Sequence, residues 1–187
     1  MRQRHYADGV PQRTSLTAPP AWIPAPRPTG SGAVDQSVAL WSALAALGLR
    51  DAVLAPGSRS APLVYGLAAD ELAGRIRAHV RIDERAAGFT ALGLSRERPE
   101  YPAAVVTTSG TATAHLHAAV MEAHHSRIPL LVLTADRPAE LREVGANQTT
   151  RQAGMFRSLT RLAVDLPAPT AAEASEPELR TAVSTAA

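Results

Sequence analysis

Short apolar runs alternate with helical segments over most of this chain, and this alternation limits the fold more than any other feature. We expect four apolar runs to form strands, at 51–55, 76–82, 103–107 and 130–134. Apolar residues at helical spacing predict helices over 34–47, 61–72, 84–95 and 111–124. A further apolar run at 162–166 is a candidate fifth strand. Strands that alternate with helices favour parallel βαβ units, so the sequence predicts an α/β fold with an open, mostly parallel sheet and helices on both faces.

The composition fits one folded domain and excludes several classes of function. Apolar residues make up 45% of the 187 residues and only 4% are aromatic, so the core must be mostly Ala, Val and Leu. The absence of Cys excludes disulfides and thiolate metal sites. No apolar stretch is long enough for a transmembrane helix, and the net charge of +2 arises in the first thirty residues, so the folded part has no nucleic-acid footprint. We expect a cytoplasmic protein with no membrane span and no nucleic-acid partner.

The chain divides into three predicted parts. Residues 1–32 are rich in Pro and end in Thr-Gly-Ser-Gly, a composition that buries too little apolar surface to fold, so we predict a disordered tail. Residues 33–167 carry the alternating pattern and form the folded domain. Residues 168–187 are mostly Ala, Thr, Glu and Pro, which is typical of a linker or of the start of a helix whose partner is absent.

Polar residues follow the first two predicted strands, at the sheet edge where open α/β folds bind their ligands. Ser58 and Arg59 lie at a helix start, where backbone N–H groups and a guanidinium suit a carboxylate or a phosphate. The alternative is a simple capped turn with Ser60 as the N-cap residue. Glu84 begins the next helix, either as a buried carboxyl that can donate a proton or as an ordinary partner of the helix dipole.

Polar residues also follow the third and fourth strands. Thr108 and Ser109 stand in a turn before a helix, as ligand-binding residues or as ordinary caps. Arg137 follows the last strand, and Asn147 and Gln148 lie in a polar loop beyond it as candidates to bond a ligand. The alternatives are a surface salt bridge for Arg137 and a solvated turn for Asn147. No single junction is specific for one function.

The ordered set of junction motifs is specific. The motifs are Pro-Gly-Ser-Arg-Ser-Ala-Pro-Leu at 56–63, Asp-Glu-Arg-Ala-Ala-Gly-Phe at 83–89, Thr-Thr-Ser-Gly-Thr-Ala at 107–112, Ala-Asp-Arg-Pro-Ala-Glu-Leu at 135–141 and Gly-Ala-Asn-Gln-Thr at 145–149. In order and spacing this set resembles the N-terminal, pyrimidine-binding domain of 2-succinyl-5-enolpyruvyl-6-hydroxy-3-cyclohexene-1-carboxylate (SEPHCHC) synthase. The resemblance spans about 34–166 and points away from acetolactate synthase and pyruvate decarboxylase.

The resemblance implies a transferase of menaquinone biosynthesis. It would decarboxylate 2-oxoglutarate on thiamine diphosphate and add the succinyl-semialdehyde unit to isochorismate. A homo-oligomer is also implied, because the family holds its cofactor between the pyrimidine-binding domain of one subunit and the diphosphate-binding domain of another. The Mg²⁺ or Mn²⁺ ion that bridges the diphosphate is expected only through that second domain, so no metal site is expected in this chain. Since the chain lacks the central and diphosphate-binding domains of the family, we expect it to lack full activity alone.

The resemblance also assigns roles to residues of this chain. Glu84 matches the glutamate that bonds the ring nitrogen of the aminopyrimidine, a contact that favours the imino tautomer and so the loss of the thiazolium C2 proton. Thr108 and Ser109 are placed beside the cofactor. Five residues are placed on the substrate side, where they suit polyanionic substrates: Ser58, Arg59, Arg137, Asn147 and Gln148.

Two other functions stay open from the sequence. The first is a non-catalytic pyrimidine domain that binds a full-length partner, which co-purification of residues 1–187 with such a partner would reveal. The second is part of another thiamine-diphosphate enzyme, which a comparison of 2-oxoglutarate with pyruvate as substrate would reveal.

Overall fold

The computed structural model describes residues 28–169 of the chain. The predicted tail over 1–32 lies mostly outside this range, and so does most of the predicted linker over 168–187. Both stay predictions. The folded domain predicted over 33–167 falls within the described residues, whose first helix begins at Gly32.

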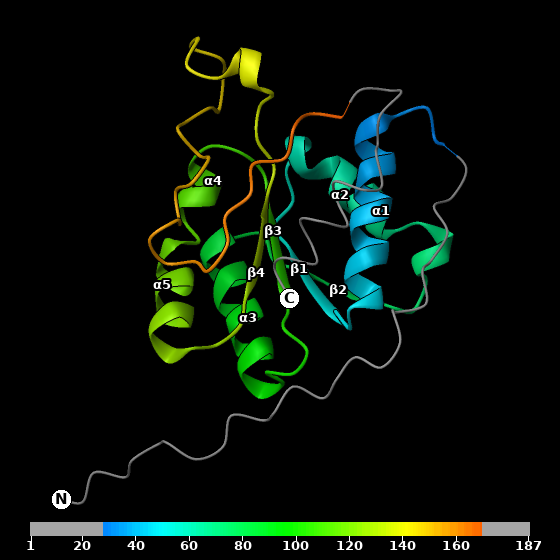
Figure 1. Ribbon diagram of the computed structural model, residues 1–187, viewed down its shortest axis with the longest axis vertical. Helices are drawn as coiled ribbons and strands as arrows, with labels where there is room; N and C mark the ends of the chain where they lie inside the picture. The colour runs from blue at the N-terminus through cyan, green and yellow to red at the C-terminus, as the bar shows by residue number, and fades with distance from the viewer. Residues whose placement is uncertain (1–27, 170–187) are drawn as a thin grey trace, which may run out of the picture.

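Four parallel strands form the centre of the described part of the chain (Figure 1). Their bounds are β1 Asp51–Leu54, β2 Arg77–Val80, β3 Ala104–Thr107 and β4 Leu131–Thr134. The order across the sheet is β2-β1-β3-β4, so β1 and β3 occupy the middle and β2 and β4 the edges. The middle strands are buried along their whole length, and β2 is largely exposed. The predicted open parallel sheet is confirmed.

Helices cover both faces of this sheet. Figure 1 shows α1 (Gly32–Ala46) and α2 (Ala61–Leu67) on one side, and α3 (Glu84–Glu97) and α5 (His117–Ser126) on the other. Successive residues of β1 point to opposite faces, so Leu54 packs in a cluster with Trp41 of α1 while Val53 packs in a second cluster with Ala91 of α3. The indole Nε1 of Trp41 also donates to the carbonyl oxygen of Leu63 at 2.7 Å, which fixes α1 against α2. The two clusters are the core that holds the sheet edge in place.

The predicted helix over 61–72 is interrupted. α2 ends at Leu67, and a 3₁₀ turn, η2 (Asp70–Leu72), follows it. Leu67 and Leu72 both belong to the cluster around Trp41. In one regular helix these two side chains would point roughly 140° apart, because each residue turns the chain by about 100°. The break lets both leucines reach the same core.

The other two differences lie further along the chain. The predicted helix over 111–124 is present in two pieces, α4 (Thr111–Ala114) and α5, with fully buried Leu116 between them. The candidate strand at 162–166 is wrong, since this segment has no strand assignment. Its Val164 is 52% exposed, and its Asp165 is held by an ion pair to Arg142 instead of by a strand ladder.

Candidate functional site at the carboxyl edge of the sheet

The four polar junctions gather at one edge of the molecule because all four strands are parallel and each junction follows the carboxyl end of a strand. Direct contacts join the first junction to the third. Gly57 lies so close to Thr108 that a Cβ atom at Gly57 would stand 2.4 Å from the Thr108 Cβ. Only glycine fits at position 57, because any side chain would collide with this turn.

The first junction forms a short 3₁₀ turn, η1 (Ser58–Ser60). Ser58 and Arg59 are exposed at this turn, so their side chains are accessible to a ligand. Ser60 occupies the N-cap position of α2, but its side chain accepts no backbone amide there. Its hydroxyl instead donates to the carbonyl oxygen of Gly57 at 3.0 Å, so Ser60 is the N-cap residue by position, as the alternative had it, but does not cap the helix through its side chain.

At the second junction, the residue that caps the helix is Asp83 and not Glu84. Asp83 is the N-cap residue of α3, and its carboxylate accepts the backbone amides of Arg85 at 2.9 Å and Ala86 at 3.1 Å. Hydrogen bonds from the Arg85 side chain and from the Ala86 amide hold the pKa of Asp83 well below its usual range. Glu84 is half-buried in the first turn and takes no part in these bonds. Sequence reasoning missed Asp83, although an Asp directly before a helix is a common capping signal.

The third and fourth junctions form one hydrogen-bonded network. The guanidinium of Arg137 donates to the Ser109 hydroxyl at 2.8 Å and to the Asn147 carbonyl oxygen at 2.8 Å. The Ser109 hydroxyl donates in turn to the Gln148 carbonyl oxygen at 3.0 Å, and the Gln148 side-chain amide donates to the Ser109 carbonyl oxygen at 3.0 Å. The expected salt bridge of Arg137 is replaced by these bonds to neutral oxygens.

This network determines which candidate side chains are buried and which are exposed to solvent. Ser109 is fully buried and its hydroxyl is already used in both directions, while Thr108 packs its side chain beneath Gly57. Both side chains therefore have contacts within the fold, and their binding of a cofactor stays a prediction. The side chains of Asn147 and Gln148 lie at the surface of the loop, with Gln148 in the left-handed region at φ 55°. Binding of a substrate by these two residues also stays a prediction.

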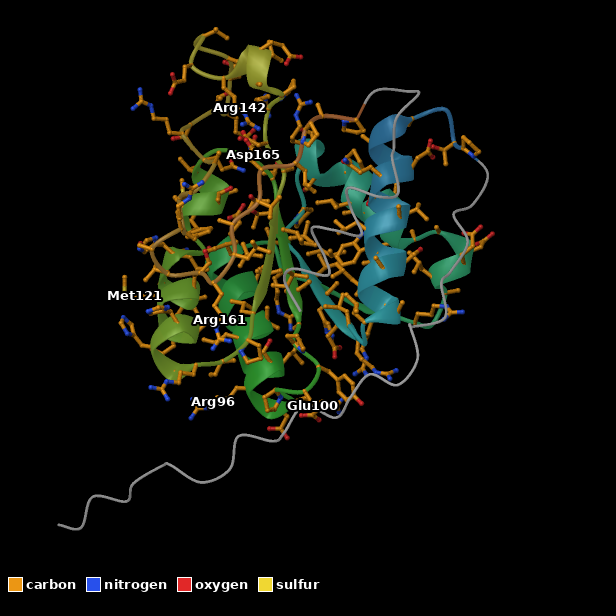
Figure 2. The ribbon with its side chains drawn as sticks, viewed as in Figure 1. Arg96, Glu100, Met121, Arg142, Arg161 and Asp165 are labelled. Carbon is orange, nitrogen blue, oxygen red and sulfur yellow. The ribbon has the colours of Figure 1, made fainter. Side chains whose placement is uncertain are left out.

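A second charged group fixes the main chain of the fourth junction. Arg142 donates through Nε to the Arg137 carbonyl oxygen at 2.7 Å and pairs with Asp136 at 3.2 Å. It also binds the carboxylate of Asp165, and Figure 2 shows these two side chains facing each other. Their hydrogen bonds raise the pKa of Arg142 and lower the pKa of Asp165. The chain beyond β4 is thus tied to the site.

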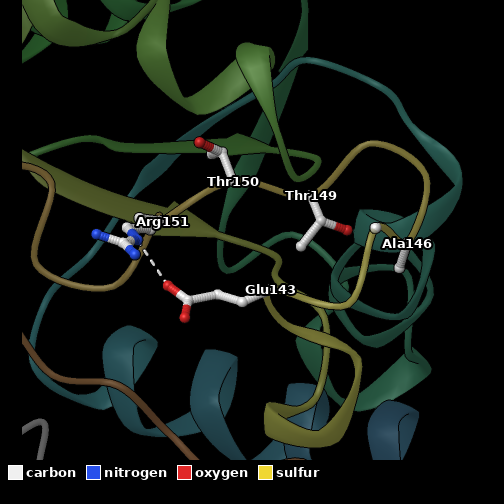
Figure 3. A pocket seen from close by; sticks show the side chains of 6 residues that line it. Glu143, Ala146, Thr149, Thr150 and Arg151 are labelled. Carbon is white, nitrogen blue, oxygen red and sulfur yellow. Dashed lines mark hydrogen bonds and ion pairs between the residues drawn. The ribbon is translucent and has the colours of Figure 1, made fainter.

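A small pocket opens beside the loop that carries Asn147 (Figure 3). Its volume is about 170 Å³, and it is lined by Glu143, Gly145, Ala146, Thr149, Thr150 and Arg151. Two of these lining residues, Glu143 and Arg151, form an ion pair at 2.6 Å, and both side chains are well exposed. The pocket lining therefore carries one acidic and one basic side chain, which are paired with each other.

Two further observations concern metal and membrane binding. Within residues 28–169, no group of three or more His, Cys, Asp or Glu side chains stands close enough together to hold a metal ion. Over the same residues, no helix has both the length and the apolar character needed to span a bilayer.

Comparison with known proteins places this geometry in a family. Residues 36–155 match the family described as thiamine pyrophosphate enzyme, N-terminal TPP binding domain. The matched region contains all four strands and all four junctions. The chain therefore belongs to this family of cofactor-binding domains.

Within this family the chain is similar to one particular enzyme, SEPHCHC synthase. It is 55% identical over 145 residues to the protein of that name from Leifsonia xyli subsp. xyli. This alignment covers 78% of this chain and 24% of the relative. The proteins of the same name from Paenarthrobacter aurescens and Clavibacter michiganensis subsp. michiganensis are 62% identical over 121 residues and 54% identical over 155 residues. Those alignments cover 65% and 83% of this chain, and 21% and 26% of the relatives. The chain spans about a quarter of the length of these curated relatives, and the resemblance in its junction motifs is confirmed.

Proposed function

We propose that this chain is the part of a SEPHCHC synthase that binds the pyrimidine ring of thiamine diphosphate and the carboxylates of the substrates. The whole enzyme would decarboxylate 2-oxoglutarate and add the remaining four-carbon unit to isochorismate, as a transferase of menaquinone biosynthesis. The observation that carries this proposal is the convergence of Arg59, Glu84 and Arg137 at the carboxyl ends of three strands of one sheet. The similarity to enzymes of this name supports the choice of substrates.

The residues at the sheet edge fit thiamine diphosphate. The half-buried carboxyl of Glu84 is not needed to cap α3, because Asp83 does this, so it is available for a ring nitrogen. Within residues 28–169 the buried hydroxyls of Thr107 and Thr108 have no hydrogen-bond partner, which leaves polar capacity at the end of β3. Thiamine diphosphate, when bound, supplies the carbon nucleophile that attacks a 2-oxo acid and stabilises the charge left after decarboxylation. In our proposal the Glu84 carboxyl holds the proton at the pyrimidine ring nitrogen.

Two arginines are suited to the substrates, which carry several carboxylates. Arg59 is exposed on its turn with Ser58 beside it, so its planar guanidinium is free to take a carboxylate in a bidentate pair. Arg137 is half-buried and fixed by Ser109, so it adds a preorganised positive charge at the same edge. We assign Asn147 and Gln148 to the polar wall beside Arg137.

The chain covers about a quarter of its relatives, so the rest of the site is proposed to lie outside it. We propose that a diphosphate-binding segment supplies the ligands of a Mg²⁺ or Mn²⁺ ion, and that the site forms in a homo-oligomer in the cytoplasm. Contact with that segment would also complete the burial of Glu84, which is partial in this chain.

The test joins this chain to the remaining three quarters of the Leifsonia xyli relative. With thiamine diphosphate, Mg²⁺, 2-oxoglutarate and isochorismate, we expect release of CO2 and loss of isochorismate. Glu84→Gln should lower kcat by about 10²–10⁴-fold, the usual contribution of a positioned proton donor. Glu97→Gln is the matched control, because Glu97 lies at the opposite end of the same helix and is exposed.

Three results would contradict the proposal. Turnover of pyruvate in preference to 2-oxoglutarate would identify another thiamine-diphosphate enzyme. An inactive joined protein whose residues 1–187 bind a full-length synthase would favour the non-catalytic module. Full activity of the Glu84→Gln variant would refute the role of Glu84.

A further inference from the structure

Gln152 connects the ends of β3 and β4 with a single side chain. Its Oε1 accepts the backbone amide of Gly110 at 3.0 Å, and its Nε2 donates to the carbonyl oxygen of Ala135 at 2.7 Å. Gln152 is only 6% exposed, its bond to Gly110 is buried, and its bond to Ala135 is partly buried. It stands in neither the motifs of the junctions nor the substrate-side set of residues, and the nearest hydrogen-bond partner of its side chain is 17 residues away in sequence.

The place of these bonds explains what they do. The last backbone bond between the two strands runs from the Ala135 amide to the Thr107 carbonyl oxygen at 3.0 Å. Beyond this bond the two segments separate into the third and fourth junctions. There the side-chain amide of Gln152 joins them, in place of direct backbone hydrogen bonds. Gly110 is buried with φ 80°, and a Cβ atom there would lie 3.0 Å from Gln148, so the turn that carries this amide packs closely against the fourth junction.

The same turn carries the support for Arg137. Ser109, directly before Gly110, accepts a hydrogen bond from the Arg137 guanidinium, and Arg137 lies two residues after Ala135. Gln152 therefore bonds close to both partners of the Ser109–Arg137 bond. Its contact at Gly110 is one residue from Ser109, and its contact at Ala135 is two residues from Arg137. If the Gln152 amide is lost, the two junctions lose their buried link, and the bonds of Ser109 with Arg137 and Gln148 must hold them together.

We propose that Gln152 is a positioning residue that sets the location of Arg137 for a substrate carboxylate. This inference rests on the proposed function, because it takes Arg137 as a substrate-binding group. Gln152 itself lies under the site and does not touch the substrate. Its effect should therefore appear mainly in KM, since the chemical groups at the cofactor are unchanged.

The variants separate positioning from general stability. Gln152→Met keeps the length of the side chain and removes both bonds, and Gln152→Glu keeps the acceptor for Gly110 but removes the donor to Ala135. Ser95→Ala is the matched control, because the Ser95 hydroxyl also accepts a buried backbone amide, that of Ala103 at 2.9 Å, at the opposite end of β3.

Two measurements are made with each variant. Amide hydrogen exchange in the 187-residue chain should become at least about tenfold faster at Gly110 in Gln152→Met and faster only at Ala103 in Ser95→Ala. In the enzyme joined as above, Gln152→Met should raise KM for 2-oxoglutarate by about tenfold or more with a smaller change in kcat, because small displacements of positioning groups have effects of up to about 10²-fold. Gln152→Glu should keep the Gly110 amide protected from exchange, and it should raise KM less than Gln152→Met does.

The outcomes distinguish the two proposals. Unchanged exchange at Gly110 in Gln152→Met, or a KM equal to that of Ser95→Ala, would overturn the role of Gln152 while wild-type activity upholds the proposed function. A wild-type enzyme that does not use 2-oxoglutarate would overturn both. If Gln152→Met does not fold, the KM of Gln152→Glu decides, and a wild-type value would count against the inference.

Discussion

Replacement of Gly57 by alanine tests whether the first and third junctions are in contact. The added Cβ atom would lie 2.4 Å from Cβ, 2.6 Å from Cγ2 and 2.9 Å from Oγ1 of Thr108. Gly57 has an extended backbone at φ −171°, so alanine meets no conformational strain there and the cost is one of space alone. Rotation of the Thr108 side chain cannot relieve the contact, because its Cβ atom is fixed to the main chain. One of the two turns must move.

We expect Gly57→Ala to lower the free energy of unfolding by about 1–3 kcal/mol, the usual cost of overpacking a buried contact. In a chain of this length that change lowers Tm by roughly 2–4 °C for each kcal/mol. The assay is urea unfolding of the 187-residue chain followed by circular dichroism. Gly93→Ala is the control: Gly93 lies in α3 with nothing within 4 Å of the added atom, so alanine should stabilise the helix by up to about 1 kcal/mol.

A double-mutant cycle identifies the contact. Gly57→Ala should cost less in a Thr108→Gly background, where the colliding Cβ atom is gone, than in a Thr108→Ala background, where it remains. If Gly57→Ala and Gly93→Ala had the same effect on stability, or if the cost of Gly57→Ala were the same in both backgrounds, the close approach of the two turns would be refuted.

Three further predictions concern single contacts. Asp165→Asn should lower stability at neutral pH by less than about 1 kcal/mol, because the pair with Arg142 is partly exposed. Since the fold lowers the pKa of Asp165, the difference from wild type in urea unfolding should begin to shrink as the pH falls below about 4, and it should vanish below the pKa of the folded state. Trp41→Phe should cost about 1–3 kcal/mol, since the Leu63 carbonyl oxygen loses its donor, and equal urea midpoints would contradict this. Asp83→Ala should accelerate amide exchange at Arg85 and Ala86, and unchanged protection there would exclude Asp83 as the cap.

Much of the fold was predictable because its signals are local. The four strands are short apolar runs bounded by polar turns, and the parallel sheet follows from their alternation with helices. The errors arose where tertiary packing decides. Leu67 and Leu72 share one core cluster only if the helix breaks between them, and the run at 162–166 has the composition of a strand but is tied to Arg142 by Asp165.

The site was predictable in part for the same reason. Arg59, Glu84 and Arg137 follow strand ends, so their place at one edge of the sheet could be expected from the order of elements. The use of Asp83 as a cap has a local sequence signal, an Asp directly before a helix. The role of Gln152 had none, because its bond to Gly110 joins residues 42 positions apart in a loop without regular structure.

The same separation fixes the stage of synthesis at which the site can be complete. Ser109 and Gly110 bond to residues that follow them by 39 and 42 positions, whereas β4 already ends at Thr134. A nascent chain that stops short of Gln148 contains all four strands of the sheet and both buried clusters except Phe156 and its neighbours. Such an intermediate has the fold without the bonds of Gln148 and Gln152 that join the third junction to the fourth. The scaffold can therefore form before these bonds do, and the last segment of the domain to emerge supplies the direct links between the two junctions.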